Sequence, residues 1–163
     1  MPDERIVQQV NGILSMNNVK FVTDPSDGTF LVPQGTAGVF IKFVDWREGT
    51  LVGLQATVLS QVDGTGERRQ KILEALNEKN RTAMFGCFYF EPDDGCVVLD
   101  YHLLGDHLQA DELMNALGAI ASTADALDEE LREAIGSGVR AIDIWQAAMG
   151  EAGGTGDNPV VTT

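Results

Sequence analysis

Basic residues are scarce in this sequence, and the shortage excludes several classes of partner. Lysine and arginine number 11 against 25 aspartates and glutamates, which gives the 163 residues a formal net charge of −14. Nucleic acids and anionic membranes attract basic surfaces, so we expect neither as a partner. The charge fits a soluble protein that repels its own copies, or one that meets a basic partner.

Long apolar runs and a targeting segment are also missing. The chain starts with Met1-Pro2-Asp3-Glu4-Arg5, whereas a secretory signal has a basic start followed by an apolar stretch. Long uncharged stretches such as 51–62 and 113–124 are too short and too polar to cross a bilayer. We therefore expect a cytoplasmic protein.

Cysteine is rare, and its placement predicts no disulfide. Cys87 and Cys96 form neither a CxxC pair nor a zinc-binding pattern. They flank an expected hairpin turn. If that turn is 91–95, Phe90 pairs with Cys96 and the two thiols point to opposite faces of the sheet. We predict that both cysteines are small, buried apolar residues.

The motifs of the common catalytic sites are absent. No Gly-Lys pair exists for a phosphate-binding loop, and no serine lies in a GxSxG elbow. A pair of Cys87 with His102 is the one nucleophile and base that the sequence leaves open, but hairpin cysteines usually serve packing. We predict a protein that is not an enzyme and has no catalytic residue and no cofactor.

The segment from Asp100 to His107 is the best candidate for metal binding. It contains both histidines of the chain, His102 and His107, and aspartates beside them. It lacks the HExxH and EF-hand spacings, so ordinary surface histidines are the favoured interpretation and we predict no metal. A metal-binding or small-ligand enzyme that uses His102 and His107 is the less favoured alternative.

The apolar pattern predicts an α+β domain. Glu4–Met16 and Ala110–Ile135 have apolar residues at helical spacing, and Gly136 follows as a stop for the long second helix. Between them we expect a helix at 67–81 and strands at 19–23, 29–32, 37–46, 50–60, 84–90 and 96–103. Short turns between strands favour a mostly antiparallel sheet with helices packed on it, followed by the long C-terminal helix. We assign 1–135 to this domain, 136–149 to an extra short helix and 150–163 to a disordered tail.

Both faces of the predicted sheet are apolar. In the strand 37–46, Val39, Ile41 and Phe43 point one way and the next residues in alternation point the other. Such a sheet needs cover on both sides. One explanation is that the extra C-terminal helix or a homodimer covers the second face. The other is that this face docks a peptide or a partner protein, and the two explanations are not exclusive. The predicted partner-binding residues are Phe40, Val44, Trp46, Phe88 and Phe90.

The long helix carries an acidic run. Its residues Asp125, Asp128, Glu129, Glu130 and Glu133 are accompanied by one basic residue, Arg132. A solvated outer face is the favoured interpretation, and a surface for a basic partner is the alternative.

One stretch resembles a known family. A helix ends Ile72-Leu73-Glu74-Ala75-Leu76-Asn77-Glu78-Lys79-Asn80 and is followed by the aromatic strand 84–90, the acidic turn Asp93-Asp94-Gly95, the strand 96–99 and a loop into the long helix. This order resembles the YbjN-like family, which is related in fold to the chaperones of type III secretion (the Tir-chaperone type). Leu76, Asn77 and Asn80 are the most specific part, and the resemblance covers about residues 4–135. It implies a bacterial, secretion-chaperone-like α+β fold, frequent homodimers, and protein binding without ATP or catalytic residues.

The two asparagines of this motif also have a physical role of their own. Asn77 and Asn80 lie near a helix end, where asparagine side chains satisfy free backbone groups. We expect them to fix the turn into the hairpin. The leading hypothesis is therefore a non-catalytic, chaperone-like module, homodimeric, that binds a peptide or partner protein through an apolar sheet or groove surface. A regulatory or structural domain that acts on a fixed partner is the alternative.

Overall fold

The computed structural model describes residues 3–152. Its helices are α1 (Glu4–Met16), α2 (Arg68–Thr82), α3 (Ala110–Ile135) and α4 (Ala141–Ala152), with a short 3-10 turn, η1 (Gly105–His107). Its strands are β1 (Val22–Thr23), β2 (Phe30–Gln34), β3 (Ala37–Trp46), β4 (Gly49–Ser60), β5 (Cys87–Glu91), β6 (Cys96–Leu104) and β7 (Val139–Arg140).

The seven strands form one sheet in the order β1-β2-β3-β4-β6-β5, and β7 pairs with the far end of β4. All these pairs are antiparallel. Helix α2 connects β4 to the hairpin, and the second strand of that hairpin, β6, is the one that lies beside β4. The predicted α+β class and mostly antiparallel sheet are confirmed.

Three elements begin and end where the sequence predicted, namely α1, β3 and α3. Asp3 caps α1 by accepting a hydrogen bond from the backbone N–H of Arg5 at 2.9 Å. Gly136 ends α3 with a φ of 80°, the left-handed conformation that glycine adopts without steric cost. Local capping therefore fixes the ends of both helices.

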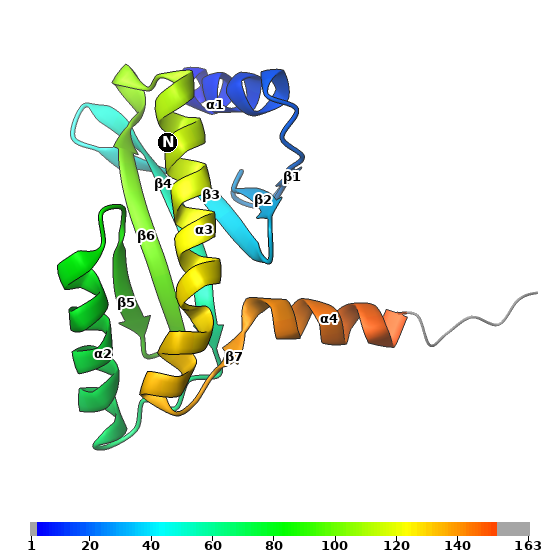
Figure 1. Ribbon diagram of the computed structural model, residues 1–163. Coiled ribbons are helices and arrows are strands. Elements are labelled where there is room, and N and C mark those ends of the chain that lie inside the picture. Colours follow the sequence, from blue (N-terminus) through cyan, green and yellow to red (C-terminus); the bar gives the residue numbers. More distant parts are fainter. Residues whose placement is uncertain (1–2, 153–163) are drawn as a thin grey trace, which may run out of the picture.

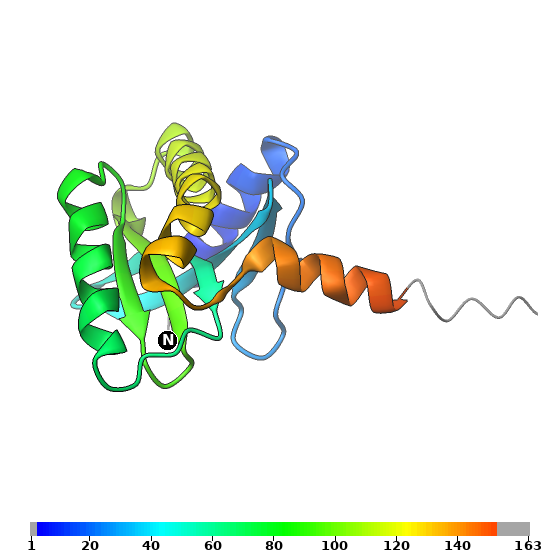
Figure 2. The same ribbon diagram turned by 60° about the horizontal axis from the view of Figure 1, so that its bottom comes forward.

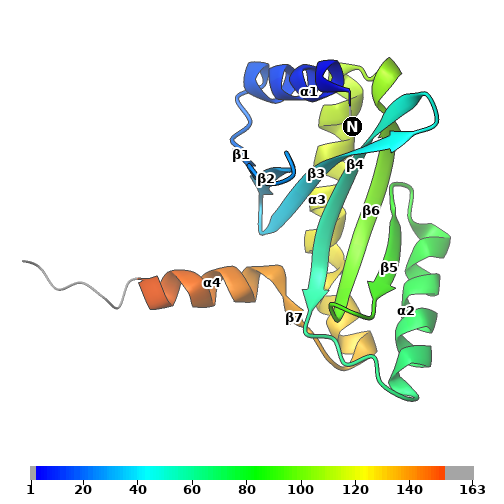
Figure 3. The same cartoon turned by 180° about the vertical axis from the view of Figure 1, so that it is seen from behind.

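Helices cover one face of the sheet and leave the other open (Figure 1). Helix α3 crosses β3, β4 and β6, α1 lies at one end, and α2 runs along β5. Viewed from behind, the strands lie in front of α3 (Figure 3). We call the first side the covered face. Its core consists of Val39, Ile41, Val52, Leu54 and Leu99 of the sheet packed against Leu113, Leu117, Ile120 and Leu131 of α3.

We call the other side the open face. In β3, the alternation that buries Val39 and Ile41 turns Phe40 and Val44 to the open face, as predicted. Cross-strand pairing extends this face over the sheet. It consists of Leu31, Phe40, Lys42, Val44, Trp46, Leu51, Gln55, Thr57, Cys87, Tyr89, Cys96, Val98, Asp100, His102 and Leu104.

The hairpin register differs from the prediction by one residue. Glu91 pairs with Cys96, so the predicted pairing of Phe90 with Cys96 is wrong, and both cysteines point to the open face. Both are free, and Cys87 is exposed while Cys96 is half-buried, so the prediction of two buried cysteines is also wrong. Cys87 lies opposite Asp100, four residues along β6 from Cys96. Four residues of strand span about 13 Å, beyond the reach of a disulfide.

The chain after α3 forms β7 and then α4, where the sequence predicted only a short helix. Helix α4 extends away from the body of the protein and leaves the open face uncovered (Figure 2). It runs to Ala152, so it includes the first residues of the segment 150–163 that was expected to be disordered. The remainder of that segment lies outside the described residues.

Candidate functional site

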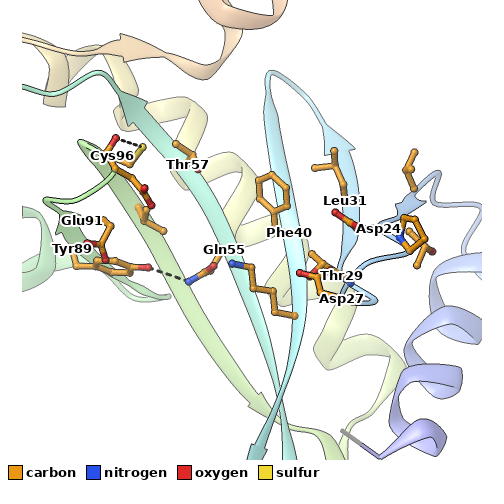
Figure 4. Close-up of a pocket in the computed structure, with 16 residues that line it drawn as sticks. Asp24, Asp27, Thr29, Leu31, Phe40, Gln55, Thr57, Tyr89, Glu91 and Cys96 are labelled. Atoms are coloured by element: carbon orange, nitrogen blue, oxygen red, sulfur yellow. Dashed lines mark hydrogen bonds between the residues drawn. The ribbon is translucent and has the colours of Figure 1, made fainter. Parts of the chain in front are cut away.

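A groove of about 750 Å³ crosses the open face (Figure 4). It runs from the loop between β1 and β2 to the hairpin of β5 and β6. The sheet supplies its floor, in which Leu31 lies opposite Phe40 and Tyr89 opposite Val98. The floor is therefore apolar at several points along its length.

Two polar groups meet inside the groove, where the Tyr89 hydroxyl reaches from the edge strand β5 toward Gln55 on β4. The Gln55 amide donates a hydrogen bond to the Tyr89 hydroxyl at 3.1 Å. Burial, and next the charges of Asp100 and Glu91, raise the pKa of Tyr89, so the phenol keeps its proton. The Tyr89 hydroxyl can then donate, and the Gln55 carbonyl oxygen can accept, which is the pair of functions that recognises a peptide backbone.

Acidic residues line both ends of the groove. Asp24 and Asp27 lie at the β1–β2 end and Glu91 at the hairpin end (Figure 4), and Asp94 of the hairpin turn also lines the groove. Hydrogen bonds from the Ser26 hydroxyl and backbone N–H lower the pKa of Asp24, so this carboxylate stays ionised. Within residues 3–152, none of the four acids is in a salt bridge.

A second apolar area lies on the open face beyond the groove, at the β3–β4 turn. Val44 lies opposite Leu51, and Leu51 lies opposite Leu104. Val44, Trp46 and Leu104 are 46%, 45% and 53% exposed. We call Val44, Trp46, Leu51 and Leu104 the apolar patch. Contiguous exposed apolar side chains of this kind typically mark contact surfaces.

The structure divides the predicted partner-binding residues between the two faces. Phe40 lines the groove, and Val44 and Trp46 belong to the apolar patch. Phe88 is 2% exposed and Phe90 packs against the core, so both lie on the covered face. The sequence analysis missed several groove residues because nothing local in the sequence shows that β6 joins β4; these are Leu31, Gln55, Tyr89 and Val98.

The histidines do not assemble a metal site in the described chain. Across residues 3–152, no group of three or more histidine, cysteine, aspartate or glutamate side chains is placed to hold an ion. The His102 Nδ1 lies 3.5 Å from Asp100 on the open face, and His107 lies in η1. The Cys87 thiol donates to the backbone oxygen of Phe88 at 3.7 Å.

Asp100 is the one open-face carboxylate with a buried atom that lacks a partner. Its Oδ1 is buried and accepts no hydrogen bond from residues 3–152. Burial raises the pKa of Asp100, and the nearby charges of His102 and Lys42 oppose that shift.

The acidic run of α3 is largely occupied by groups of the same chain. Glu129 pairs with Arg132 and Arg140, and Glu130 pairs with Lys79. Asp125 accepts a hydrogen bond from the Thr36 hydroxyl. These contacts leave the acids of the groove as the better placed surface for a basic partner.

Comparison with known proteins gives a family and a set of similar folds. The sequence model of the family described as "T3SS (YopN, CesT) and YbjN peptide-binding chaperone 1" matches residues 4–143. The comparison with curated proteins gives no match. No helix in the described part of the chain combines the length and apolar character needed to cross a membrane.

Three solved structures share the fold at low sequence identity. The ExsC–ExsE complex contains a chain with 18% identity and a TM-score of 0.59, and the match covers 80% of this chain and 97% of that one. The HopA1–SchA chaperone–effector complex matches with 13% identity and a TM-score of 0.57, and the match covers 79% of this chain and 99% of that one. The Yersinia pestis type III secretion chaperone SycH, in complex with a fragment of YscM2, matches with 13% identity and a TM-score of 0.51. The match covers 75% of this chain and 98% of that one.

Proposed function

The chain belongs to the family of T3SS and YbjN peptide-binding chaperones, and from that premise we propose that it binds an extended segment of a partner protein along its open face. The observation that carries this proposal is the groove, which has an apolar floor at Phe40 and Leu31 and a backbone-binding pair in Gln55 and Tyr89. The protein then acts by binding alone, with no chemical change in its partner.

The apolar patch extends this binding surface. It lies on the same face as the groove, so a segment longer than the groove continues over Val44 and Trp46. Exposed apolar side chains lose water when a partner covers them, at about 25 cal/mol per Å² of apolar surface. The related folds support this use of the chain, since two of them are described as a chaperone with an effector or with a protein fragment.

We also propose that the protein is a homodimer and that the edge formed by α2 and β5 holds the interface. Three large apolar side chains are exposed on α2 or just after it: Leu73 at 52%, Met84 at 91% and Phe85 at 41%. Helix α2 and β5 lie at one edge of the molecule (Figure 1), and a second copy docked there would cover these side chains. Size-exclusion chromatography with light scattering tests this, and a monomer at all concentrations would refute it.

A reducing compartment such as the cytoplasm fits the same proposal. Cys87 is exposed and both thiols are free. Exposed free thiols are expected where the environment keeps cysteines reduced.

The central test is whether a natural partner depends on the open face. The tagged full chain is purified from its native cell, and co-purifying proteins are identified by mass spectrometry against an untagged control. We compare the wild type with Phe40→Glu, which places a charge on the groove floor, and with Met16→Glu, which places one at a site that is 85% exposed on α1. Circular dichroism confirms that each variant is folded.

We expect one protein to co-purify with the wild type and with Met16→Glu at near-equal amounts, and to be lost with Phe40→Glu. A partner that Phe40→Glu retains in full would show that the open face is not the binding surface. Overlapping peptides of the partner then separate two roles. A chaperone binds one such peptide, whereas a regulatory domain that recognises a folded partner binds none.

A further inference from the structure

We propose that the groove selects an extended segment that carries a cationic side chain near each end of an apolar stretch. This inference rests on the proposed function and specifies the chemistry of the partner. It follows from the distribution of charge along the groove, which differs between its ends and its middle.

Both ends of the groove present negative charge that the protein itself does not neutralise. Asp24 and Asp27 at one end, and Glu91 and Asp94 at the other, form no salt bridge within the described chain. Elsewhere the protein pairs its few cations, as in Arg68 with Asp63. An arginine or lysine of a partner therefore finds at each end a carboxylate that is in no salt bridge within the described chain, where its charge is attracted and its N–H groups are accepted.

The middle of the groove has different requirements. Phe40 of β3 and Val98 of β6 provide apolar surface, and Lys42 is the one cation among the lining residues. Lys42 repels a positive charge at this point, so the cations of the segment belong at its ends. Gln55 and Tyr89 can bind the backbone between them.

The width of the sheet sets the spacing of the two cations. From β2 to β5 the groove crosses four strand-to-strand steps, which amount to about 19 Å at roughly 4.8 Å each. The two ends are also offset along the strands, so the path is somewhat longer. At about 3.3 Å per residue, an extended segment that spans this path places its two cations about six to eight positions apart.

The chain itself does not supply this occupant. A second copy brings a further net charge of −14, which opposes its approach to an acidic groove. Residues 141–163, which follow β7, contain no lysine or arginine. The complementary charge must therefore come from another protein.

Selection from random peptides tests the inference without knowledge of the natural partner. Phage that display random ten-residue peptides are panned on the full-length protein and, in parallel, on Phe40→Glu. We expect the wild type to enrich peptides with two basic residues about six to eight positions apart and apolar residues between them. Phe40→Glu should enrich none of these.

The best peptide is then synthesised with a fluorophore, and its affinity is measured by fluorescence anisotropy. The double variant Glu91→Gln/Asp94→Asn removes the acids of one end, and Asp27→Asn removes a charge at the other while keeping an acceptor for the Thr29 N–H. We expect each to weaken binding by about 2- to 10-fold, the range for one or two exposed ion pairs. The control double variant Glu74→Gln/Glu133→Gln removes as much negative charge as Glu91→Gln/Asp94→Asn does, but from exposed residues of α2 and α3. It should leave the affinity for the peptide unchanged.

The outcomes separate this inference from the function on which it rests. Enriched peptides without an excess of basic residues, or full affinity in both groove-end variants, would overturn the charge selection and leave groove binding intact. Failure of the wild type to enrich any peptide over Phe40→Glu would overturn the proposed function, and the inference with it.

Discussion

At the scale of single residues, Asn80 holds the connection between α2 and the hairpin. Its side-chain amide donates to the Phe88 backbone oxygen at 3.0 Å, and its side-chain oxygen accepts from the Phe88 N–H at 2.7 Å. Both groups of one β5 residue are thus satisfied on the side of the strand away from β6. The predicted role of Asn80 in fixing this turn is confirmed, whereas the side chain of Asn77 is exposed and makes no such bond.

Replacing Asn80 should therefore destabilise the fold. Asn80→Ala leaves the Phe88 N–H and C=O without partners, at a cost of about 1–3 kcal/mol in the free energy of unfolding. Urea denaturation followed by circular dichroism measures it. Asn77→Ala on the same helix is the matched control and should change stability by less than about 0.5 kcal/mol. Equal losses in the two variants would refute a specific role for Asn80.

Asp100 should make stability depend on pH in the opposite sense from an ion-paired carboxylate. Burial raises the pKa of Asp100 in the folded state, so the folded protein holds this proton more tightly than the unfolded chain does. The contribution of protonated Asp100 to the free energy of unfolding is fully present below the pKa of the unfolded chain, about 4. It is lost as the pH rises through the pKa of the folded protein.

Asp100→Asn should remove that loss because the amide does not ionise. From about pH 4 to about pH 7, we expect the free energy of unfolding of the variant to rise by about 1 kcal/mol relative to that of the wild type. This is the order of the cost of a buried, unsatisfied polar atom. Urea denaturation at both pH values measures the gain, and Asp94→Asn at an exposed site is the control. A difference from the wild type that is the same at both pH values would contradict this account.

The candidate site shows which residue-level features a sequence can reveal. Alternation within β3 placed Phe40, Val44 and Trp46 on one face correctly, because period-two geometry is a local property. Relating Phe88 and Phe90 to that face requires the pairing of β6 with β4, in which partners such as Leu51 and Leu104 are far apart in the sequence. The sequence therefore predicted a binding surface that includes Phe40, but not the groove residues contributed by β5 and β6, which depend on that pairing.

At the scale of elements, glycines in and after α3 have opposite roles. Gly136 has a φ of 80°, whereas Gly118 lies within the helix and a Cβ added there meets no atom within 4 Å. Gly136→Ala should cost about 1 kcal/mol because an alanine is strained in the left-handed conformation. Gly118→Ala should gain about 0.5–1 kcal/mol, because alanine loses less backbone freedom in a helix. Thermal unfolding measures the Tm of both variants. A shift of Tm in the same direction for both would refute the opposite roles of the two glycines.

Element bounds were predictable wherever one pattern was long or capped. The apolar stripe of α3 and its Gly136 stop gave both ends of that helix, and the alternation of β3 gave both ends of that strand. The predicted end of the strand 29–32 was wrong: β2 continues through Pro33 to Gln34, since β1 pairs only with Phe30 and Leu31 and leaves the Pro33 edge free. A proline without an N–H fits a strand at such an edge.

At the scale of the whole molecule, two forces of opposite sign act on association. The net charge of −14 makes two copies of the chain repel each other, whereas the unpaired acids of the groove attract a cationic segment. Salt screens both interactions over a Debye length of about 10 Å at 0.1 M. Dimerisation and partner binding should therefore respond to salt in opposite directions.

Salt should strengthen the homodimer and weaken the peptide complex. Between about 20 mM and about 300 mM sodium chloride, we expect the dimer dissociation constant to fall several-fold, because apolar contacts hold the edge while repulsion is screened. Sedimentation velocity measures it. The dissociation constant of a cationic peptide selected on the groove should rise several-fold over the same range, as measured by fluorescence anisotropy. A dimer that dissociates as salt rises would mean that ion pairs hold the interface, and it would place that interface away from Leu73, Met84 and Phe85.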